Sequence, residues 1–165
     1  MLPQAYPFFK DLDISSLKNN IILLDIDGTL VFDNGLELDD ITIQKVKELA
    51  QSNKVFLCSN SKDLKRDKKF QAILGVGSVS GVYKKPNRKI KDLALEKFNK
   101  LEDAKQGLNK SAPIVVIGDK SIIDGRFAKK IGAEFIKIRG LYSGRESIFV
   151  RVSYFVDRLY SICCK

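Results

Sequence analysis

Five short aliphatic segments recur along the chain, and most of them are continuous apolar runs rather than alternating ones. They cover residues 20–24, 54–58, 76–83, 113–117 and 133–138. Continuous runs of this length are typical of strands that are buried on both faces of a parallel sheet, because a strand with one solvated face alternates. The pattern therefore predicts buried parallel strands.

The segments between these runs carry apolar residues at helical spacing. One helix is expected to begin at Asp39 or Asp40, either of which can cap it. Its apolar positions are Ile43, Val46, Leu49 and Ala50. Further helices are expected over residues 64–74, 88–101 and 121–131, the last stopped by Gly132. Strand and helix alternate, which predicts an α/β fold with a doubly wound parallel sheet and right-handed crossovers.

A chain of 165 residues suits one domain, and neither a linker nor an internal repeat divides it. We therefore expect a single domain over residues 1–165, with a lead-in (1–19) and an amphipathic tail (141–165) at its ends. No apolar run approaches the ~20 residues that span a bilayer, and residues 1–13 lack the order of a signal peptide. A cytoplasmic location is expected, with peripheral attachment at a membrane surface as the alternative.

The tail places apolar residues at helical spacing, with arginines between them. The apolar positions are Ile148, Val152, Phe155, Leu159 and Ile162, and the arginines are Arg145, Arg151 and Arg158. Such a helix either packs on the core or lies in a layer of lipid headgroups, and no sequence feature separates the two interpretations. Peripheral contact with an anionic membrane therefore stands beside core packing as an expectation.

The net charge of +9 favours polyanionic surroundings, whether phosphorylated substrates, anionic lipid or nucleic acid. A basic run over residues 62–69 is interpreted as a solvated helix face, with attraction to an anionic surface as the alternative. We find no aromatic stacking motif for bases, so nucleic acid is not the expected partner. The sequence contains no histidine, which excludes a Cys/His zinc site and requires any general acid or base to be another residue type.

Polar side chains follow four of the predicted strands at the point where each strand ends. They are Asp25, Asp27 and Thr29 after the first strand, Ser59 and Asn60 after the second, Lys84 and Lys85 after the third, and Gly118, Asp119 and Asp124 after the fourth. In doubly wound sheets, ligands bind beyond the carboxyl ends of the strands, near the topological switch point. The four strand ends therefore predict one site of carboxylates, a hydroxyl, an amide and an ammonium group.

Several oxygen ligands without histidine suit a hard cation, and we expect Mg²⁺. A carboxylate can also attack phosphorus and form an aspartyl-phosphate. Residues two apart on a strand point the same way, so Asp25 and Asp27 can both reach the site. We expect Asp25 to be the nucleophile and Asp27 to protonate the leaving group and later deprotonate water.

The other residues at the strand ends are expected to support this chemistry. The expected cation ligands are the four acidic residues Asp25, Asp27, Asp119 and Asp124. Ser59 is expected to bond a phosphoryl oxygen, and Lys85, which adjoins Pro86, is preferred over Lys84 for neutralising phosphoryl charge. The expected substrate-binding residues are Gly28, Thr29 and Asn60.

Four motifs resemble those of the haloacid dehalogenase (HAD) superfamily. DIDGTL (25–30) resembles the first motif, VFLCSN (55–60) the second, KKP (84–86) the third and GDKSIID (118–124) the fourth. They occur in order over about 100 residues, which makes the combination highly specific. The resemblance implies a Rossmann-like core, Mg²⁺ dependence and phosphoaspartate chemistry. Asp at the second acidic position is typical of the phosphatases in this superfamily, not of its dehalogenases.

A narrower resemblance extends over almost the whole chain. The lead-in, the KKP motif, the fourth motif and the tail sequence GRESIFVRVSYFVDRLY are similar to YqeG-like HAD phosphatases, relatives of the mitochondrial phosphatidylglycerophosphatase. The chain departs from that family at Gly28, where Asn is common, and at residues 103–111, which are longer than usual for that turn. The resemblance implies hydrolysis of a lipid phosphomonoester such as phosphatidylglycerophosphate.

The spacing of the motifs leaves no room for a sizeable cap domain. Only a loop and one helix fit between Thr29 and Ser59, and one helix and one strand between Asn60 and Lys85. Such an open site suits a bulky or surface-bound substrate, or a lid from another subunit of an oligomer.

Two alternatives to a lipid phosphatase stay open. The first is a phosphatase of a soluble sugar phosphate, a nucleotide or a nucleic-acid end, and the second is a non-catalytic binding protein on the same scaffold.

Overall fold

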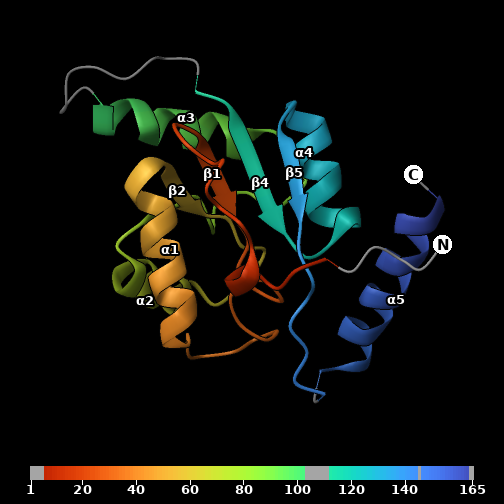
Figure 1. The fold of residues 1–165 in the computed structure, drawn as a ribbon. Helices are drawn as coiled ribbons and strands as arrows, with labels where there is room; N and C mark the ends of the chain where they lie inside the picture. The colour runs from red at the N-terminus through yellow and green to blue at the C-terminus, as the bar shows by residue number, and fades with distance from the viewer. Residues whose placement is uncertain (1–5, 103–111, 145, 164–165) are drawn as a thin grey trace.

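A parallel five-stranded sheet forms the centre of the computed structural model, which describes residues 6–102, 112–144 and 146–163 (Figure 1). The strands are β1 (Ile21–Leu24), β2 (Lys54–Leu57), β3 (Gly77–Ser78), β4 (Ile114–Gly118) and β5 (Glu134–Lys137). Their spatial order is β3-β2-β1-β4-β5, and all neighbours pair in parallel. The predicted α/β fold with a parallel sheet is confirmed.

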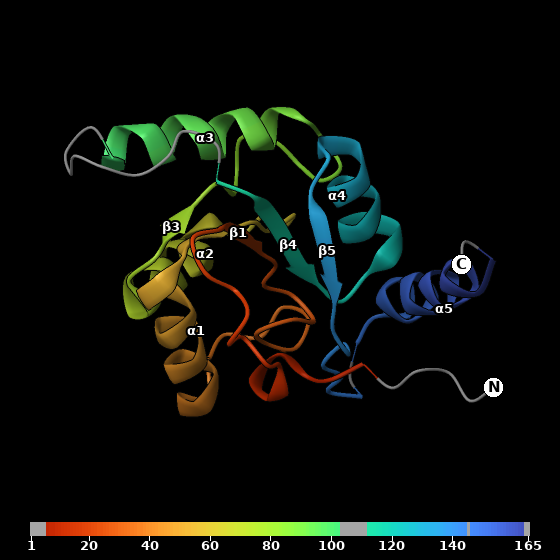
Figure 2. The ribbon, with the colours of Figure 1, turned by 45° about the horizontal axis from the view of Figure 1, so that its top comes forward.

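Helices cover both faces of this sheet (Figures 1 and 2). They are α1 (Asp40–Ser52), α2 (Leu64–Leu74), α3 (Lys89–Glu102) and α4 (Arg126–Ile131), whereas a fifth helix, α5 (Ile148–Cys163), lies at the edge of the sheet. One hydrophobic cluster joins α1 and α2 to one face of the sheet, and a second joins α3 and α4 to the other face. The doubly wound arrangement is therefore confirmed, and α2 has the bounds that the sequence predicted.

Alternating side chains of β1 supply both clusters. Ile22 and Leu24 belong to the cluster under α1 and α2, whereas Ile21 and Leu23 belong to the one under α3 and α4. All four are fully buried, which explains why this strand is apolar at every position.

The strand order reverses at β1. The chain runs from β1 to β2 and β3 on one side and then crosses to β4 and β5 on the other. The register sets Leu24 beside Leu57 on one side and Ile117 on the other, so the three strands end level with one another. The carboxyl ends of β1 and β4 therefore form the switch point where such sheets bind ligands.

The third strand is much shorter than residues 76–83, so its predicted extent is wrong. Gly77 and Ser78 form the strand, and Val79 donates one further hydrogen bond to the carbonyl of Leu57 at 2.9 Å. The chain then turns away from the sheet, leaving Val82 67% exposed. This turn carries the lysine motif back towards the end of β1.

The helix predicted over residues 121–131 begins with a wider turn, η2 (Ser121–Gly125), before α4. The amides of Asp124 and Gly125 both donate to the carbonyl of Lys120, at 2.7 and 3.3 Å. Turns of this π type widen a helix and are frequent at functional sites. Here the turn directs Asp124 inward, where it is buried, and Gly132 ends α4 as predicted.

The segments on which a cap domain would be inserted are short. A loop and α1 connect β1 to β2, and α2 and β3 precede Lys85. The absence of a sizeable cap is thus confirmed for these segments, which the structure describes throughout. The long turn at residues 103–111 lies outside the described residues.

The predicted tail helix is present as α5, which lies beside the carboxyl edge of the sheet, where it contacts η2 (Figures 1 and 2). The apolar stripe faces solvent: Ile148, Val152, Phe155 and Leu159 are between 48% and 72% exposed. Core packing of this stripe, one of the two interpretations, is therefore wrong for these residues. Arg145 and the side chain of Ile162 lie outside the described set. In the described parts of the chain, no helix has the length and apolarity of a membrane span.

Candidate active site

A cavity of about 420 Å³ opens at the carboxyl edge of the sheet. Its walls contain residues from all four motifs: Asp25, Asp27, Asn60, Lys85, Asp119 and Asp124. The other three predicted residues, Gly28, Thr29 and Ser59, adjoin or bond residues of these walls. The fold therefore brings the predicted site residues together.

Asp25 follows β1 directly and is 7% exposed. One carboxylate oxygen accepts a bond from Lys85 Nζ at 2.5 Å, and the other accepts one from the Thr29 hydroxyl at 3.1 Å. Burial raises the pKa of Asp25 to about 7, although the charge of Lys85 opposes this shift. Thr29, predicted to bind substrate, thus fixes the orientation of Asp25.

Lys85 is the buried lysine of the KKP motif, whereas Lys84 is exposed. Its ammonium group lies between two carboxylates, 2.5 Å from Asp25 Oδ1 and 2.5 Å from Asp124 Oδ1. Burial opposes a charged lysine, but these two carboxylates outweigh it and hold the pKa of Lys85 well above its ordinary value. Lys85 therefore stays charged beside the predicted nucleophile.

The second motif holds its neighbours in place. The Asn60 side chain accepts from the Lys85 amide at 2.7 Å and donates to the Lys85 carbonyl at 3.1 Å. Asn60, predicted to bind substrate, thus positions the lysine. Ser59 is buried, and its hydroxyl lies 3.3 Å from Asp27 Oδ2 and 2.9 Å from the amide of Ser61.

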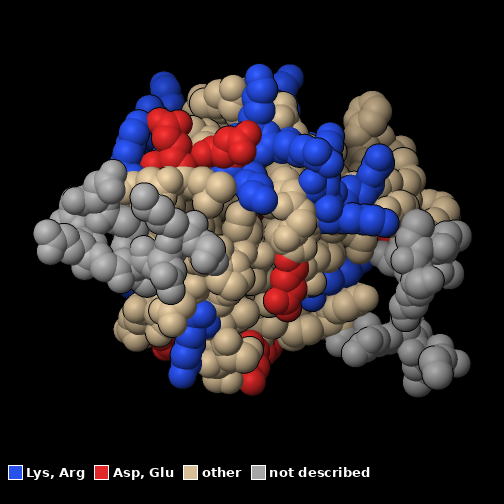
Figure 3. Space-filling view, turned by 90° about the horizontal axis from the view of Figure 1, so that it is seen from above, with Lys and Arg blue, Asp and Glu red and all other residues tan. Residues whose placement is uncertain are grey.

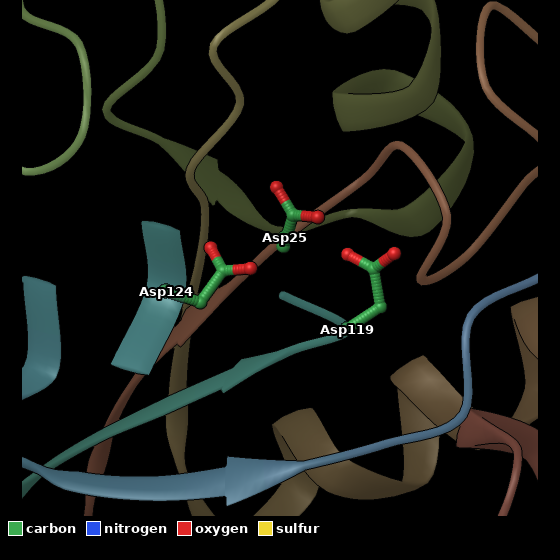
Figure 4. A group of neighbouring side chains, drawn as sticks. All are labelled: Asp25, Asp119 and Asp124. Atoms are coloured by element: carbon green, nitrogen blue, oxygen red, sulfur yellow. The ribbon is translucent and has the colours of Figure 1, made fainter. Parts of the chain in front are cut away.

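Three carboxylates converge on one point of the cavity (Figure 4). Asp25, Asp119 and Asp124 each place an oxygen within 4.8 Å of the other two. Both oxygens of Asp119 are buried without a hydrogen-bond partner among the described residues. Burial raises the pKa of Asp119 to about 6.

This cluster fits a hard divalent cation. Its donors are all oxygen atoms, which Mg²⁺ prefers. The nearest ammonium group to Asp119, that of Lys120, lies 3.9 Å from Oδ2, beyond hydrogen-bond distance, and a buried carboxylate that accepts no hydrogen bond is costly unless an ion compensates it. Of the four predicted cation ligands, the structure places the side chains of Asp25, Asp119 and Asp124 in the cluster. The carboxylate of Asp27 lies elsewhere.

Asp27 is bound by an arginine that the sequence analysis did not assign to the site. The Arg66 guanidinium contacts both oxygens of Asp27, at 2.7 and 2.8 Å. Burial raises the pKa of Asp27, but the hydrogen bonds and charge of Arg66 outweigh it and bring the pKa below its ordinary value. Arg66 is 5% exposed, so the interpretation of the basic run as a solvated face is wrong for this residue.

Gly28 allows a second unexpected residue to reach the site. Its φ of +80° favours glycine, and a methyl group there would overlap both the Asp119 carboxylate and the Tyr154 hydroxyl. Tyr154 comes from α5, and its ring lies 4.4 Å from the ammonium group of Lys120, which lines the cavity. Helix α5 thus forms part of the surroundings of Asp119.

The affinity for Mg²⁺ is expected to rise with pH and then level off. A cation binds the ionised carboxylates, so protons held by Asp25 (pKa about 7) and Asp119 (pKa about 6) must leave when it binds. Below about pH 6 both groups hold protons and affinity falls; above about pH 7 both are ionised and the dependence ends. Calorimetry in two buffers of different ionisation enthalpy measures the affinity and the protons released.

Two variants control this measurement. Asp119→Asn removes a ligand and is expected to weaken binding about tenfold or more, whereas Asp33→Asn changes a cavity carboxylate outside the cluster and keeps the pH dependence. An affinity that falls as pH rises, or that is unchanged in Asp119→Asn, would contradict the assignment.

Comparison with models of protein families matches residues 2–141 to the model described as mitochondrial PGP phosphatase. This range includes all four motifs and the whole sheet, and it ends before α5. Neither the curated proteins nor the solved structures contain a match to the chain.

Proposed function

Because the chain belongs to the mitochondrial PGP phosphatase family, a family of HAD-type phosphatases, we propose that it hydrolyses a phosphate monoester through an aspartyl-phosphate on Asp25 with Mg²⁺. We further propose a lipid phosphate, such as phosphatidylglycerophosphate, as the substrate. The observation that carries the mechanism is the group of Asp25, Lys85, Asp119 and Asp124 at the cavity.

In the first half-reaction, a carboxylate oxygen of Asp25 attacks phosphorus. The new bond joins this oxygen to phosphorus, the ester P–O bond breaks, and the leaving oxygen takes a proton from Asp27. The Thr29 hydroxyl bonds Asp25 Oδ2 and Lys85 bonds Oδ1, which fixes the carboxylate before attack.

In the second half-reaction, water attacks the phosphorus of the aspartyl-phosphate. Asp27 accepts a proton from this water, the bond from phosphorus to Asp25 breaks, and inorganic phosphate leaves. Arg66 favours the ionised form of Asp27, which this step requires, and opposes the protonated form, which the first half-reaction requires.

The transferred phosphoryl group carries negative charge that the site must offset. Lys85 brings a buried ammonium group within 2.5 Å of Asp25, and the Ser59 hydroxyl is the donor expected to meet a phosphoryl oxygen. A divalent cation held by Asp25, Asp119 and Asp124 would supply further positive charge and favour ionised Asp25.

The lipid substrate is supported by the description of the family, which names PGP phosphatase. The connections between the strands and helices around the site also support a lipid substrate, since they contain no cap that would enclose a small substrate. The same description refers to mitochondria, whereas the sequence favoured the cytoplasm, and the location of this chain stays a prediction.

The substrate assignment is tested by phosphate release from phosphatidylglycerophosphate in mixed micelles, beside a sugar phosphate, a nucleotide and DNA with a 3′-phosphate. We expect the lipid to be preferred and a chelator to abolish release, with Mg²⁺ restoring it. Preference for a soluble ester would remove the lipid part of the proposal and keep the phosphatase. Release from none of them would favour a binding protein.

A further inference from the structure

Helix α5 has its polar and apolar sides in an unusual arrangement. The side that meets the protein contains Asp157, which accepts bonds from the Ile122 amide at 2.7 Å and from Lys137 Nζ at 2.8 Å. The opposite side exposes six apolar residues, which are Ile148, Phe149, Val152, Phe155, Val156 and Leu159. Phe149 is 83% exposed. A helix that covers a protein core normally turns its apolar side inward, so this stripe is suited to an apolar surface outside the chain.

Positive charge accompanies the apolar stripe. Arg151 and Arg158 are both exposed and lie seven residues apart, which places them on the same side of α5. The chain as a whole carries +9, and the Lys and Arg side chains seen in Figure 3 lie on the face at the amino ends of the strands, opposite the cavity. An apolar stripe flanked by arginines, on a positively charged protein, complements a bilayer that contains anionic phospholipid.

The same end of the molecule exposes further apolar side chains. Phe32 and Leu36, 46% and 63% exposed, lie in the loop that follows β1, and Val82 lies in the turn before Lys85. Both segments leave carboxyl ends of strands, where the cavity opens. These side chains add exposed apolar surface at the edge of the sheet where the cavity opens.

Helix α5 is also joined to the site itself. The Tyr154 hydroxyl is buried against Gly28 and Asp119, and its ring lies over Lys120. The inward side of the helix thus touches the surroundings of the carboxylate cluster, while the outward side is exposed.

We propose that α5 is a membrane-docking helix whose outer apolar side binds the surface of an anionic phospholipid bilayer and sets the cavity at that surface. This inference rests on the proposed lipid substrate, whose phosphate lies at the bilayer surface. Docking supplies the substrate to an open site without a cap, because the headgroup is presented in the layer where the helix lies.

Co-sedimentation with vesicles of phosphatidylcholine, with or without phosphatidylglycerol, tests the docking directly. The full chain is expected to bind the anionic vesicles, and the bound fraction is expected to fall as salt increases. The double variant Phe149→Ser/Phe155→Ser is expected to lower the partition coefficient about tenfold or more, since two exposed aromatic side chains are removed. Ile41→Ser, which changes a 61% exposed residue on α1, is the matched control and should bind like the wild type.

Activity measured on the same proteins separates this proposal from the proposed function. With the double variant, phosphate release from a soluble monoester should be unchanged, while release from lipid in anionic vesicles should fall with the bound fraction. Docking is overturned if the wild type does not bind, if Ile41→Ser loses as much binding, or if light scattering shows a dimer that the double variant separates. Normal docking without phosphate release from any ester would overturn the proposed function instead.

Discussion

Asp25→Asn is expected to lower phosphate release by about 10⁴-fold or more while the protein stays folded. An amide oxygen is a much weaker nucleophile than a carboxylate, and no other described carboxylate shares the contacts of Asp25 with Lys85 and Thr29. Stopped assays of phosphate release measure the turnover, and circular dichroism of the same samples shows whether the protein is folded.

Asp33→Asn is the matched control for this loss. Asp33 also lines the cavity, but it is not part of the carboxylate cluster, so we expect activity within a few fold of the wild type. Wild-type turnover by Asp25→Asn would exclude the proposed nucleophile. An equal loss in both variants would indicate a general effect of charge and would also contradict the assignment.

Lys85→Met is expected to destabilise the cation-free protein by about 3–5 kcal/mol, because it leaves buried carboxylates without their ammonium partner. It should also reduce turnover by about 10²–10³-fold, the range for loss of one group that stabilises developing charge. Urea unfolding with a chelator present measures the loss of stability, and phosphate release with Mg²⁺ measures the loss of turnover.

The loss of stability in Lys85→Met should depend on pH in a stated direction. Lys85 lowers the pKa of Asp25, so its removal raises that pKa further above the unfolded value. A carboxyl group whose pKa is raised on folding destabilises the protein as pH rises above the unfolded value, so the loss should be greater at about pH 8 than at about pH 5.

Lys84→Met serves as the control, since Lys84 is exposed, and should change stability by no more than about 0.5 kcal/mol. A larger effect of Lys84→Met than of Lys85→Met would reverse the assignment of the motif lysine.

The sheet and the carboxylate site could be predicted because both depend on short local patterns. Continuous apolar runs identified the buried strands, and Asp25, Asp119 and Asp124 follow strands whose parallel order brings their ends together. The short β3 could not be predicted from its apolar residues, because these continue into an exposed turn.

The burial of Arg66 could be predicted in part from the sequence. Arg66, Phe70 and Leu74 are spaced four apart and all lie on the buried side of α2. The neighbouring lysines made this segment resemble a solvated face, and the partner, Asp27, is far away in the sequence. Tyr154 had no such indication, since it lies away from the apolar stripe of α5 and its place depends on how that helix meets the sheet.

Chemical trapping of the phosphorylated enzyme tests the central claim most directly. Asp27→Asn should slow the hydrolysis of the intermediate, and an aryl phosphate, whose leaving group needs no proton, should still form it. An acid quench during turnover of that substrate, followed by borohydride reduction, should convert Asp25 to homoserine. Mass spectrometry of the peptide that contains residue 25 should detect this change only when substrate and Mg²⁺ are both present. Turnover with an unmodified Asp25, or modification at another carboxylate, would contradict the account.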